Sequence, residues 1–317
     1  MNLDLLDLLC CPDCRAPLSL DNDALRCTQC TSVYPIVDGI PRFVPAENYA
    51  ASFGFQWNRF PRTQLDSSSG VPVSRDRFFS STVWTADELR GKRVLDAGSG
   101  SGRFAEIALS AGARLVAIDY SAAVDAARAN LGASKDLDVV QADMFRLPFR
   151  EGTFDYVYSL GVLQHTPDPE RAFRSLLPML RSGGKIVIDV YPKTWMNLFW
   201  PKYWFRPITR RMRGERLFRI VERLVPVLLP ISRILGRIPL LGRKLRWLVP
   251  VANYEGIHPL SDAQIREWAV LDTFDMFSPA HDHPQSAATL RRWLDEAGLA
   301  SGEVVKSGHL VARARKN

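Results

Sequence analysis

Between residues 91 and 190, short apolar runs alternate with longer amphipathic stretches. Five of the runs have the composition of strands: "RVLDAGS", "RLVAIDY", "DVVQADM", "FDYVYSL" and "KIVIDVY". Strands that alternate with helices predict βαβ units and a parallel sheet. Later in the chain, residues 286–298, "SAATLRRWLDEAG", predict a helix that stops at a glycine, and "GEVVKS" and "HLVARAR" predict two last strands. The pattern predicts an α/β core over 91–191 and 286–317.

The remaining residues lack this alternation. Residues 46–90 are rich in serine, aromatic residues and arginine without a strand period, so we interpret them as a helical connector or lid. Residues 192–285 are basic, aromatic and interrupted by prolines, which indicates an insertion that forms a cap or acceptor pocket. Residues 1–45 begin with a short amphipathic helix, Leu3–Leu9, and then become cysteine-rich.

All five cysteines lie within the first 30 residues. Four of them form two Cys-x2-Cys knuckles, Cys11 with Cys14 and Cys27 with Cys30. Four thiolates at this spacing bind one Zn²⁺ tetrahedrally and leave no position for water, so the predicted zinc is structural. Cys10 ends the amphipathic helix, and we expect it to be packed and not to bind metal. Free or redox-active thiols are the alternative.

The cysteine segment continues into "YPIVDGIPRFVP". Together they resemble the zinc ribbon of the small activator protein that partners tRNA and protein methyltransferases. The resemblance covers roughly residues 1–45 and implies that the ribbon has a protein partner.

The strongest chemical motif is "VLDAGSGSGRFAEIAL", residues 94–109. A buried strand runs into a glycine loop and then into a helix, as in proteins that bring their backbone close to a nucleotide. Asp119 ends the next strand, 21 residues after Gly98, where an acid binds ribose hydroxyls. The loop reads G-x-G-x-G, and Arg103 replaces the last small residue of a dinucleotide fingerprint.

With "QADM" and "FDYVYSLGVLQH", these motifs resemble class I S-adenosylmethionine-dependent methyltransferases of the type 11-like group. The resemblance implies S-adenosylmethionine as the cofactor. It also implies a Rossmann-like, seven-stranded class I methyltransferase sheet, here with a small N-terminal zinc ribbon and a helical insertion. The cofactor-binding residues that it implies are Asp96, Gly98, Gly100 and Gly102 for the methionine part, Asp119 for the ribose, Asp143, Met144 and Tyr120 for the adenine, and Leu160 and Gly161 beside the sulfonium. A Rossmann-like oxidoreductase or epimerase is the alternative.

Methyl transfer from a sulfonium is an in-line displacement, so the protein chiefly aligns the acceptor and excludes water. A base is needed only where the acceptor must lose a proton. His165, after the fourth strand of the core, is the best-placed candidate for that catalytic role, and a packed histidine is the alternative. Residues 272–285, "DTFDMFSPAHDHPQ", predict a loop that completes the acceptor pocket.

The sequence excludes some chemical classes of acceptor and leaves several others open. No cysteine follows Cys30, which excludes a cysteine nucleophile in the core, and "SLGV" replaces the Asn/Asp-Pro-Pro-aromatic motif of enzymes that methylate adenine or glutamine amino groups. We therefore expect an enzyme that methylates a small-molecule, glycan or lipid-linked acceptor. An rRNA or tRNA base methyltransferase is one alternative. A non-catalytic adaptor that binds S-adenosylmethionine is another.

Charge is distributed unevenly. The formal net charge is +7, but residues 193–247 hold 14 Lys or Arg against Glu215 and Glu222, a net of +12. The same segment holds eight aromatic residues and apolar patches such as "LVPVLLPI". Three interpretations stay open: a helical cap with solvated arginines, a surface that lies in an anionic membrane interface, and a nucleic-acid groove. Pro226 and Pro230 predict that helices here are short.

The N-terminus lacks the basic and apolar regions of a secretory signal, and no apolar run approaches the roughly 20 residues of a membrane span. We therefore expect a cytoplasmic protein, with peripheral association at the inner membrane face if the basic segment binds lipid.

Overall fold

The computed structural model describes residues 2–45, 48–195 and 200–317. Its main sheet has seven strands in the order β10-β11-β9-β8-β5-β6-β7. These strands are β5 (Arg93–Ala97), β6 (Arg114–Asp119), β7 (Leu137–Gln141), β8 (Phe154–Ser159), β9 (Leu180–Val190), β10 (Ala300–Ser307) and β11 (His309–Arg315). Strands β5 to β9 are parallel, and β11 runs antiparallel to β9 and β10. This is the Rossmann-like class I methyltransferase sheet that the sequence predicts.

Alternate residues of each strand pack on opposite faces of the sheet, as the period of two requires. On one face, Leu95 and Val116 pack with helices α8 (Pro169–Leu176) and α13 (Ala287–Glu296). On the other face, Val94 and Leu115 pack with α4 (Val73–Thr82), α6 (Arg103–Ser110) and α7 (Ala123–Leu131). Both faces are thus covered, which explains why the central strands read as unbroken apolar runs.

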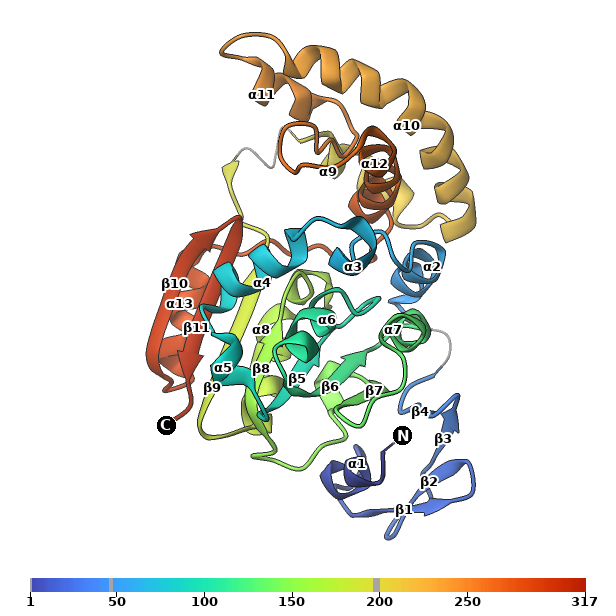
Figure 1. Ribbon diagram of the computed structural model, residues 1–317, viewed down its shortest axis with the longest axis vertical. Helices are drawn as coiled ribbons and strands as arrows, with labels where there is room; N and C mark the ends of the chain where they lie inside the picture. Colours follow the sequence, from blue (N-terminus) through green and yellow to red (C-terminus); the bar gives the residue numbers. More distant parts are fainter. Residues whose placement is uncertain (1, 46–47, 196–199) are drawn as a thin grey trace.

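The N-terminal module is a helix and a small antiparallel sheet at one end of the molecule (Figure 1). It comprises α1 (Leu3–Leu8), β1 (Leu18–Asp21), β2 (Ala24–Cys27), β3 (Val33–Val37) and β4 (Ile40–Pro41). Leu5 and Leu9 share one apolar cluster with Phe149 and Phe154 of the main domain. Arg15 donates to the carbonyl oxygens of Leu147 and Phe149, at 2.8 and 2.5 Å. The module is therefore packed against the main domain and continues its core.

Helices also follow the module and connect it to the main sheet. They are α2 (Ala51–Arg59), α3 (Asp66–Ser69), α4 and α5 (Ala86–Leu89). Short 3-10 turns η1 (Met144–Arg146), η2 (Leu163–His165) and η3 (Leu177–Met179) follow strands or helices of the core.

At the end of the molecule opposite the module lie α9 (Pro201–Thr209), α10 (Gly214–Gly236), α11 (Gly242–Leu245), η5 (Arg246–Leu248) and α12 (Asp262–Phe277) (Figure 1). One apolar cluster joins α10 to α12 and also includes Val73 of α4; its members on the two helices include Phe218, Val221, Val225, Trp268 and Phe274. Among the described residues, no helix combines the length and apolarity needed to cross a bilayer.

Two expectations about this region are wrong. Helix α10 continues for 23 residues through Pro226 and Pro230, where short helices were predicted. Both prolines are exposed, so the carbonyl groups left without an intrahelical donor can bind water, and the helix accommodates the rings by curving (Figure 1). The segment 272–285 begins inside α12 and is a loop only after Phe277, because Ser261 caps a helix that keeps its apolar face through Phe277.

Candidate active site

The carboxyl ends of β5, β6 and β8 border one cavity of about 1570 Å³. The glycine loop forms its base, and side chains from α2, α4, α9 and α12 form its walls. Strand order reverses here, because β6 lies on one side of β5 and β8 on the other, and open α/β sheets bind ligands at this crevice. The cavity exceeds the roughly 300–1,000 Å³ of an ordinary ligand pocket, so it has room for a cofactor and an acceptor together.

The glycine loop needs its glycines for conformation and for space. Gly98, Gly100 and Gly102 have φ of +95°, +53° and +93°. A Cβ atom on Gly98 would lie 2.5 Å from both methyl carbons of Val162. A Cβ on Gly102 would lie 2.9 Å from a methyl carbon of Leu131, and one on Gly100 would lie 3.1 Å from Nε1 of Trp57. Larger residues would therefore distort this edge of the cavity.

Asp119 lies at the end of β6 and faces the loop. Its Oδ2 accepts from the backbone nitrogen of Gly100 at 2.9 Å, and its Oδ1 accepts from the backbone and hydroxyl of Ser121 at 2.8 and 2.7 Å. Burial raises the pKa of the Asp119 carboxyl, and these hydrogen bonds oppose the rise. The carboxylate is thus fixed at the rim where the cavity lining includes Asp119 and Tyr120.

Several polar atoms of the cavity lining have no partner. Among the described residues, the hydroxyls of Ser99 and Ser101 in the loop and both amide atoms of Gln56 in α2 are buried and make no hydrogen bond. Burial raises the pKa of Asp96 to about 8. Buried polar groups are normally satisfied. The unmet donors and acceptors therefore fit a ligand with amino and carboxylate groups, such as the methionine part of S-adenosylmethionine.

The predicted adenine and sulfonium residues lie farther along the same edge. Met144 and Tyr120 line the cavity, and the Tyr120 ring lies 4.9 Å from that of Tyr49. Asp143 does not line it: its Oδ1 caps η1 by accepting from Phe145 at 2.8 Å, and burial raises its pKa. Asp96 also lies behind the lining. Leu160 and Gly161 both border the cavity.

His165 ends η2 and borders the cavity. Its ring is buried between Phe53 and Tyr191, with centroids 5.2 and 5.4 Å away. Its Nδ1 lies 3.1 Å from the carbonyl oxygen of His281. Since a carbonyl only accepts, Nδ1 carries the hydrogen and Nε2 keeps a lone pair. Burial lowers the pKa of His165, against the opposing effect of Asp275 and Asp282. The ring is therefore neutral at pH 7.

The sequence interpretation missed a buried ion pair beside Gly161. Oδ2 of Asp189 in β9 lies 2.7 Å from the Arg77 guanidinium and 3.3 Å from Nδ1 of His309, and Oδ1 accepts from the backbone of Gly161. Burial raises the pKa of Asp189, but Arg77 and His309 together hold it well below its usual range. The signal was visible: "KIVIDVY" places one acid inside an otherwise apolar buried strand.

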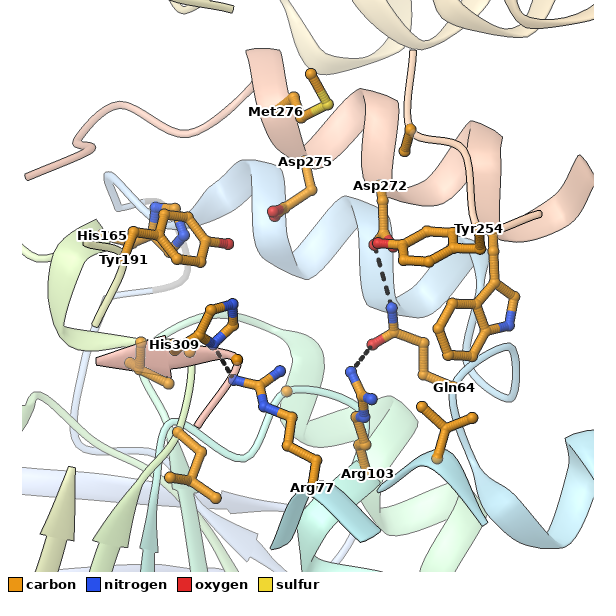
Figure 2. A pocket seen from close by; sticks show the side chains of 18 of the residues that line it. Gln64, Arg77, Arg103, His165, Tyr191, Tyr254, Asp272, Asp275, Met276 and His309 are labelled. Atoms are coloured by element: carbon orange, nitrogen blue, oxygen red, sulfur yellow. Dashed lines mark hydrogen bonds between the residues drawn. The ribbon is translucent and has the colours of Figure 1, made fainter. Parts of the chain in front are cut away.

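A second polar chain crosses the opposite wall (Figure 2). Arg103 donates to Oε1 of Gln64 at 2.7 Å, and Nε2 of Gln64 donates to Asp272 at 3.1 Å. The Tyr254 hydroxyl also donates to Asp272. Burial raises the pKa of Asp272 to about 7. Asp275 comes from the next part of α12 and points into the space between Tyr191 and Asp272 (Figure 2). These residues offer polar contacts to an acceptor in an otherwise largely aromatic cavity.

The four predicted zinc ligands lie together. The Sγ atoms of Cys11, Cys14, Cys27 and Cys30 all lie within 4.8 Å of one another, with Cys11 and Cys30 at 3.7 Å. A tetrahedral zinc with Zn–S bonds of about 2.3 Å separates its sulfurs by roughly 3.8 Å. The backbone nitrogen of Cys30 donates to Cys27 Sγ at 3.3 Å. The donor set therefore fits a closed structural zinc site, while Cys10 is buried away from it.

Comparison with known proteins gives two family matches. Residues 95–188 match the family described as methyltransferase domain, and residues 2–39 match the family described as Trm112p-like protein. The first match contains the glycine loop, Asp119, Asp143 and His165.

Among similar proteins, the demethylmenaquinone methyltransferase of Thermobifida fusca (strain YX) is 35% identical over 122 residues, 37% of this chain and 52% of that protein. The ubiquinone biosynthesis O-methyltransferase of Xanthomonas euvesicatoria pv. vesicatoria is 35% identical over 115 residues, 35% of this chain and 48% of that protein. This chain thus spans about half the length of these relatives. The solved magnesium protoporphyrin IX methyltransferase of Synechocystis PCC 6803 is 17% identical with a TM-score of 0.46, covering 85% of this chain and 97% of that one.

The family matches agree with the strand order, the glycine loop and the cysteine cluster. Residues 95–188 thus match a methyltransferase domain, and residues 2–39, ahead of it in the chain, match a Trm112p-like module.

Proposed function

We propose that the chain transfers a methyl group from S-adenosylmethionine to a small-molecule acceptor, and that both bind in the cavity at the carboxyl edge of the sheet. One observation carries the proposal: the same cavity is bordered by the glycine loop and Asp119 and also by His165 and residues of α12. In this proposal, the described residues of 46–90 form a lid over the methyltransferase core, and the described residues of 192–285 form a cap.

When bound, S-adenosylmethionine supplies a methyl group on a sulfonium, whose leaving group its charge already activates. The residues of this chain bind and orient the cofactor and the acceptor. The loop backbone and the unpaired hydroxyls of Ser99 and Ser101 take the methionine part, with Asp96 behind them, and Asp119 takes the ribose hydroxyls. Tyr120 and Met144 border the adenine, with Asp143 behind Met144 at the cap of η1, and Leu160 and Gly161 border the sulfonium.

His165 serves an acceptor that must lose a proton. Its Nδ1 is engaged by a carbonyl, so Nε2 is the atom that takes the proton. The neutral state at pH 7, which burial imposes, is the state that a base requires. The relatives named as quinone-pathway methyltransferases support an acceptor of small-molecule type. Zn²⁺ in the N-terminal module is structural, because four thiolates leave it no open position.

Calorimetry with S-adenosylmethionine tests the proposal. Asp119→Ala should weaken binding by about 1–3 kcal/mol, because two ribose hydroxyls lose a charged acceptor. Asp87→Ala is the matched control, since the Asp87 side chain is 90% exposed on α5, away from the cavity lining. Unchanged affinity in the Asp119 variant would refute the ribose assignment. Formation of S-adenosylhomocysteine in the presence of an acceptor then separates an enzyme from a binding adaptor.

A further inference from the structure

Exposed apolar side chains gather on the cap. Of nineteen large apolar side chains that are exposed among the described residues, fifteen lie between positions 195 and 257. Most of them come from α9, α10, η5 and the turn at 238–241, which lie at the end of the molecule opposite the zinc module (Figure 1). Exposed apolar side chains gathered in one region indicate a binding surface.

Helix α9 buries its charged side chains and exposes apolar ones, the reverse of a surface helix in a soluble protein. Lys202 and Arg206 point inward, are only 3% and 6% exposed, and pair with Asp282. The side chains that face outward are apolar: Phe205 is 48% and Ile208 is 69% exposed. A helix in water places its charges outside. This helix has the opposite arrangement, which is stable when its outer face meets an apolar medium.

Helix α10 has two apolar stripes. Val221, Val225 and Leu229 are buried and belong to the apolar cluster that joins α10 to α12. A second stripe is exposed, and its members follow one another at intervals of three and four residues on one face: Ile220, Leu224, Val227, Ile231 and Ile234. Folding of the chain accounts for the first stripe. The second stripe needs a partner outside the described residues.

The turn between α10 and α11 carries the most exposed apolar residue. Leu240 is fully exposed and has φ of +64°, a left-handed conformation that leucine rarely adopts. Leu241 beside it is 56% exposed. The surrounding segment 193–247 has a net charge of +12, calculated as 14 basic residues minus Glu215 and Glu222. Apolar tips in a basic setting match the chemistry of an anionic lipid interface.

The acceptor cavity extends to this surface. Leu245, Trp247 and Leu248 line the cavity, while the Trp247 and Leu248 side chains are also 53% and 55% exposed. The ring of Trp247 lies 5.4 Å from that of Trp200, another lining residue. One rim of the cavity is thus built from the same residues as the exposed apolar surface.

We propose that α9, α10 and residues 238–248 form a lipid-docking surface that lies in the interface of an anionic bilayer, and that an amphipathic lipid acceptor enters the cavity past Trp247. The docking surface stands by itself, whereas the entry of an acceptor rests on the proposed function. The half-buried Asp272 and the inward-pointing Asp275 then face the polar head of the acceptor, and the aromatic rim faces its tail.

Two other partners fit the surface less well. Single-stranded nucleic acid binds basic grooves with stacking aromatic side chains, but it has no use for an outward aliphatic stripe on α10. A second copy of the chain would bring two like-charged basic surfaces together, each with the exposed Arg210, Arg211 and Arg213, and this repulsion opposes association. An anionic bilayer satisfies both the apolar stripe and the basic charge.

Flotation with vesicles tests the docking surface. The protein should float with vesicles of 30% phosphatidylglycerol in phosphatidylcholine at low salt, and should be released by salt. Changing Arg210, Arg211 and Arg213 to Glu should weaken partitioning about 100-fold or more. The matched control changes Arg114, Lys135 and Lys306 to Glu, which alters the net charge equally through exposed residues of the core.

Apolar insertion has its own pair of variants. Leu240→Asn should weaken vesicle binding about tenfold without unfolding, because asparagine tolerates the left-handed conformation. Val83→Asn is the control: Val83 is 60% exposed with φ of +52°, but it lies on the core. Equal vesicle binding by both variants would contradict insertion. Absence of vesicle binding at low salt would overturn the surface, as would tight binding to a 20-nucleotide single-stranded RNA in its place, or a dimer in sedimentation.

Entry into the cavity is tested with a long-chain alcohol that carries a diazirine, incorporated in the same vesicles. Photolysis should label peptides from the cavity walls, such as 53–57 and 268–276, in addition to 238–248. Labelling of the surface peptides alone would overturn the entry route and leave docking intact. Calorimetry with S-adenosylmethionine on the same variants should be unchanged, so a failure of cofactor binding is distinguishable from a failure of docking.

Discussion

Gly98→Ala measures how tightly the glycine loop is built. Two costs add at this position. A residue with a Cβ at φ of +95° costs about 1–2 kcal/mol. The new methyl would lie 2.5 Å from both Val162 methyl carbons, and such overpacking costs about 1–3 kcal/mol. The variant should therefore lose about 2–5 kcal/mol of unfolding free energy, measured by urea denaturation without cofactor.

A double-mutant cycle separates the two costs. Val162→Ala removes the methyl groups that the new side chain meets, so Gly98→Ala with Val162→Ala should recover the overpacking part but not the backbone part. Gly70→Ala supplies the backbone cost alone, because Gly70 has φ of +70° and no atom within 4 Å of a built Cβ. If Gly98→Ala costs no more than Gly70→Ala and shows no coupling to Val162, the steric account of the loop is wrong.

Three further outcomes follow. Elemental analysis should give about one zinc per chain for the wild type and for Cys10→Ser, whereas Cys27→Ser should lose both the metal and stability. His165→Ala should lower kcat by about 10²–10⁴-fold with unchanged cofactor affinity. Because the folded pKa of His165 is lowered, the wild-type rate should rise with pH through a midpoint below about 6.5 and stay level from about pH 7 to 8. A midpoint above about 7 would contradict the assignment of His165 as the base. Asp189→Asn should cost about 3–5 kcal/mol by removing the charge that compensates Arg77. Since the folded pKa of Asp189 is depressed, its contribution is present above about pH 4 and is lost as the pH falls, so the variant should show a shallower acid transition by denaturation than the wild type.

The core was predictable because its signals are local. A few residues are enough to identify a strand such as "RLVAIDY" or the loop Gly98 to Gly102, and Asp119 follows Gly98 at the expected spacing. The spacing of the two knuckles likewise predicts that Cys11, Cys14, Cys27 and Cys30 lie together, as they do in the structure.

Other features depend on contacts between distant segments. The pairing of Arg77 with Asp189 joins positions 112 residues apart, and Gln64 meets Asp272 across 208 residues. Nothing in the neighbourhood of Arg77 or Gln64 marks them. Helix α10 failed as a prediction for a different reason: local propensity forbids Pro226 and Pro230 in a helix interior, but packing of the buried stripe on α12 outweighs a cost of about 3 kcal/mol for each proline.

The packing of the zinc module on the main domain has a consequence for biosynthesis. Leu9 meets Phe149, and the backbone nitrogen of Cys10 donates to the carbonyl oxygen of Pro148, so the partner surface is made about 140 residues after Leu9 and Cys10. At about 5–20 residues per second, a ribosome needs roughly 7–28 seconds to supply it. During that interval Leu5 and Leu9 lack their partners Phe149 and Phe154, so the apolar face of the new module is uncovered. We therefore expect the yield of folded chain to depend on zinc supply and on chaperone protection of this face, before the main sheet exists.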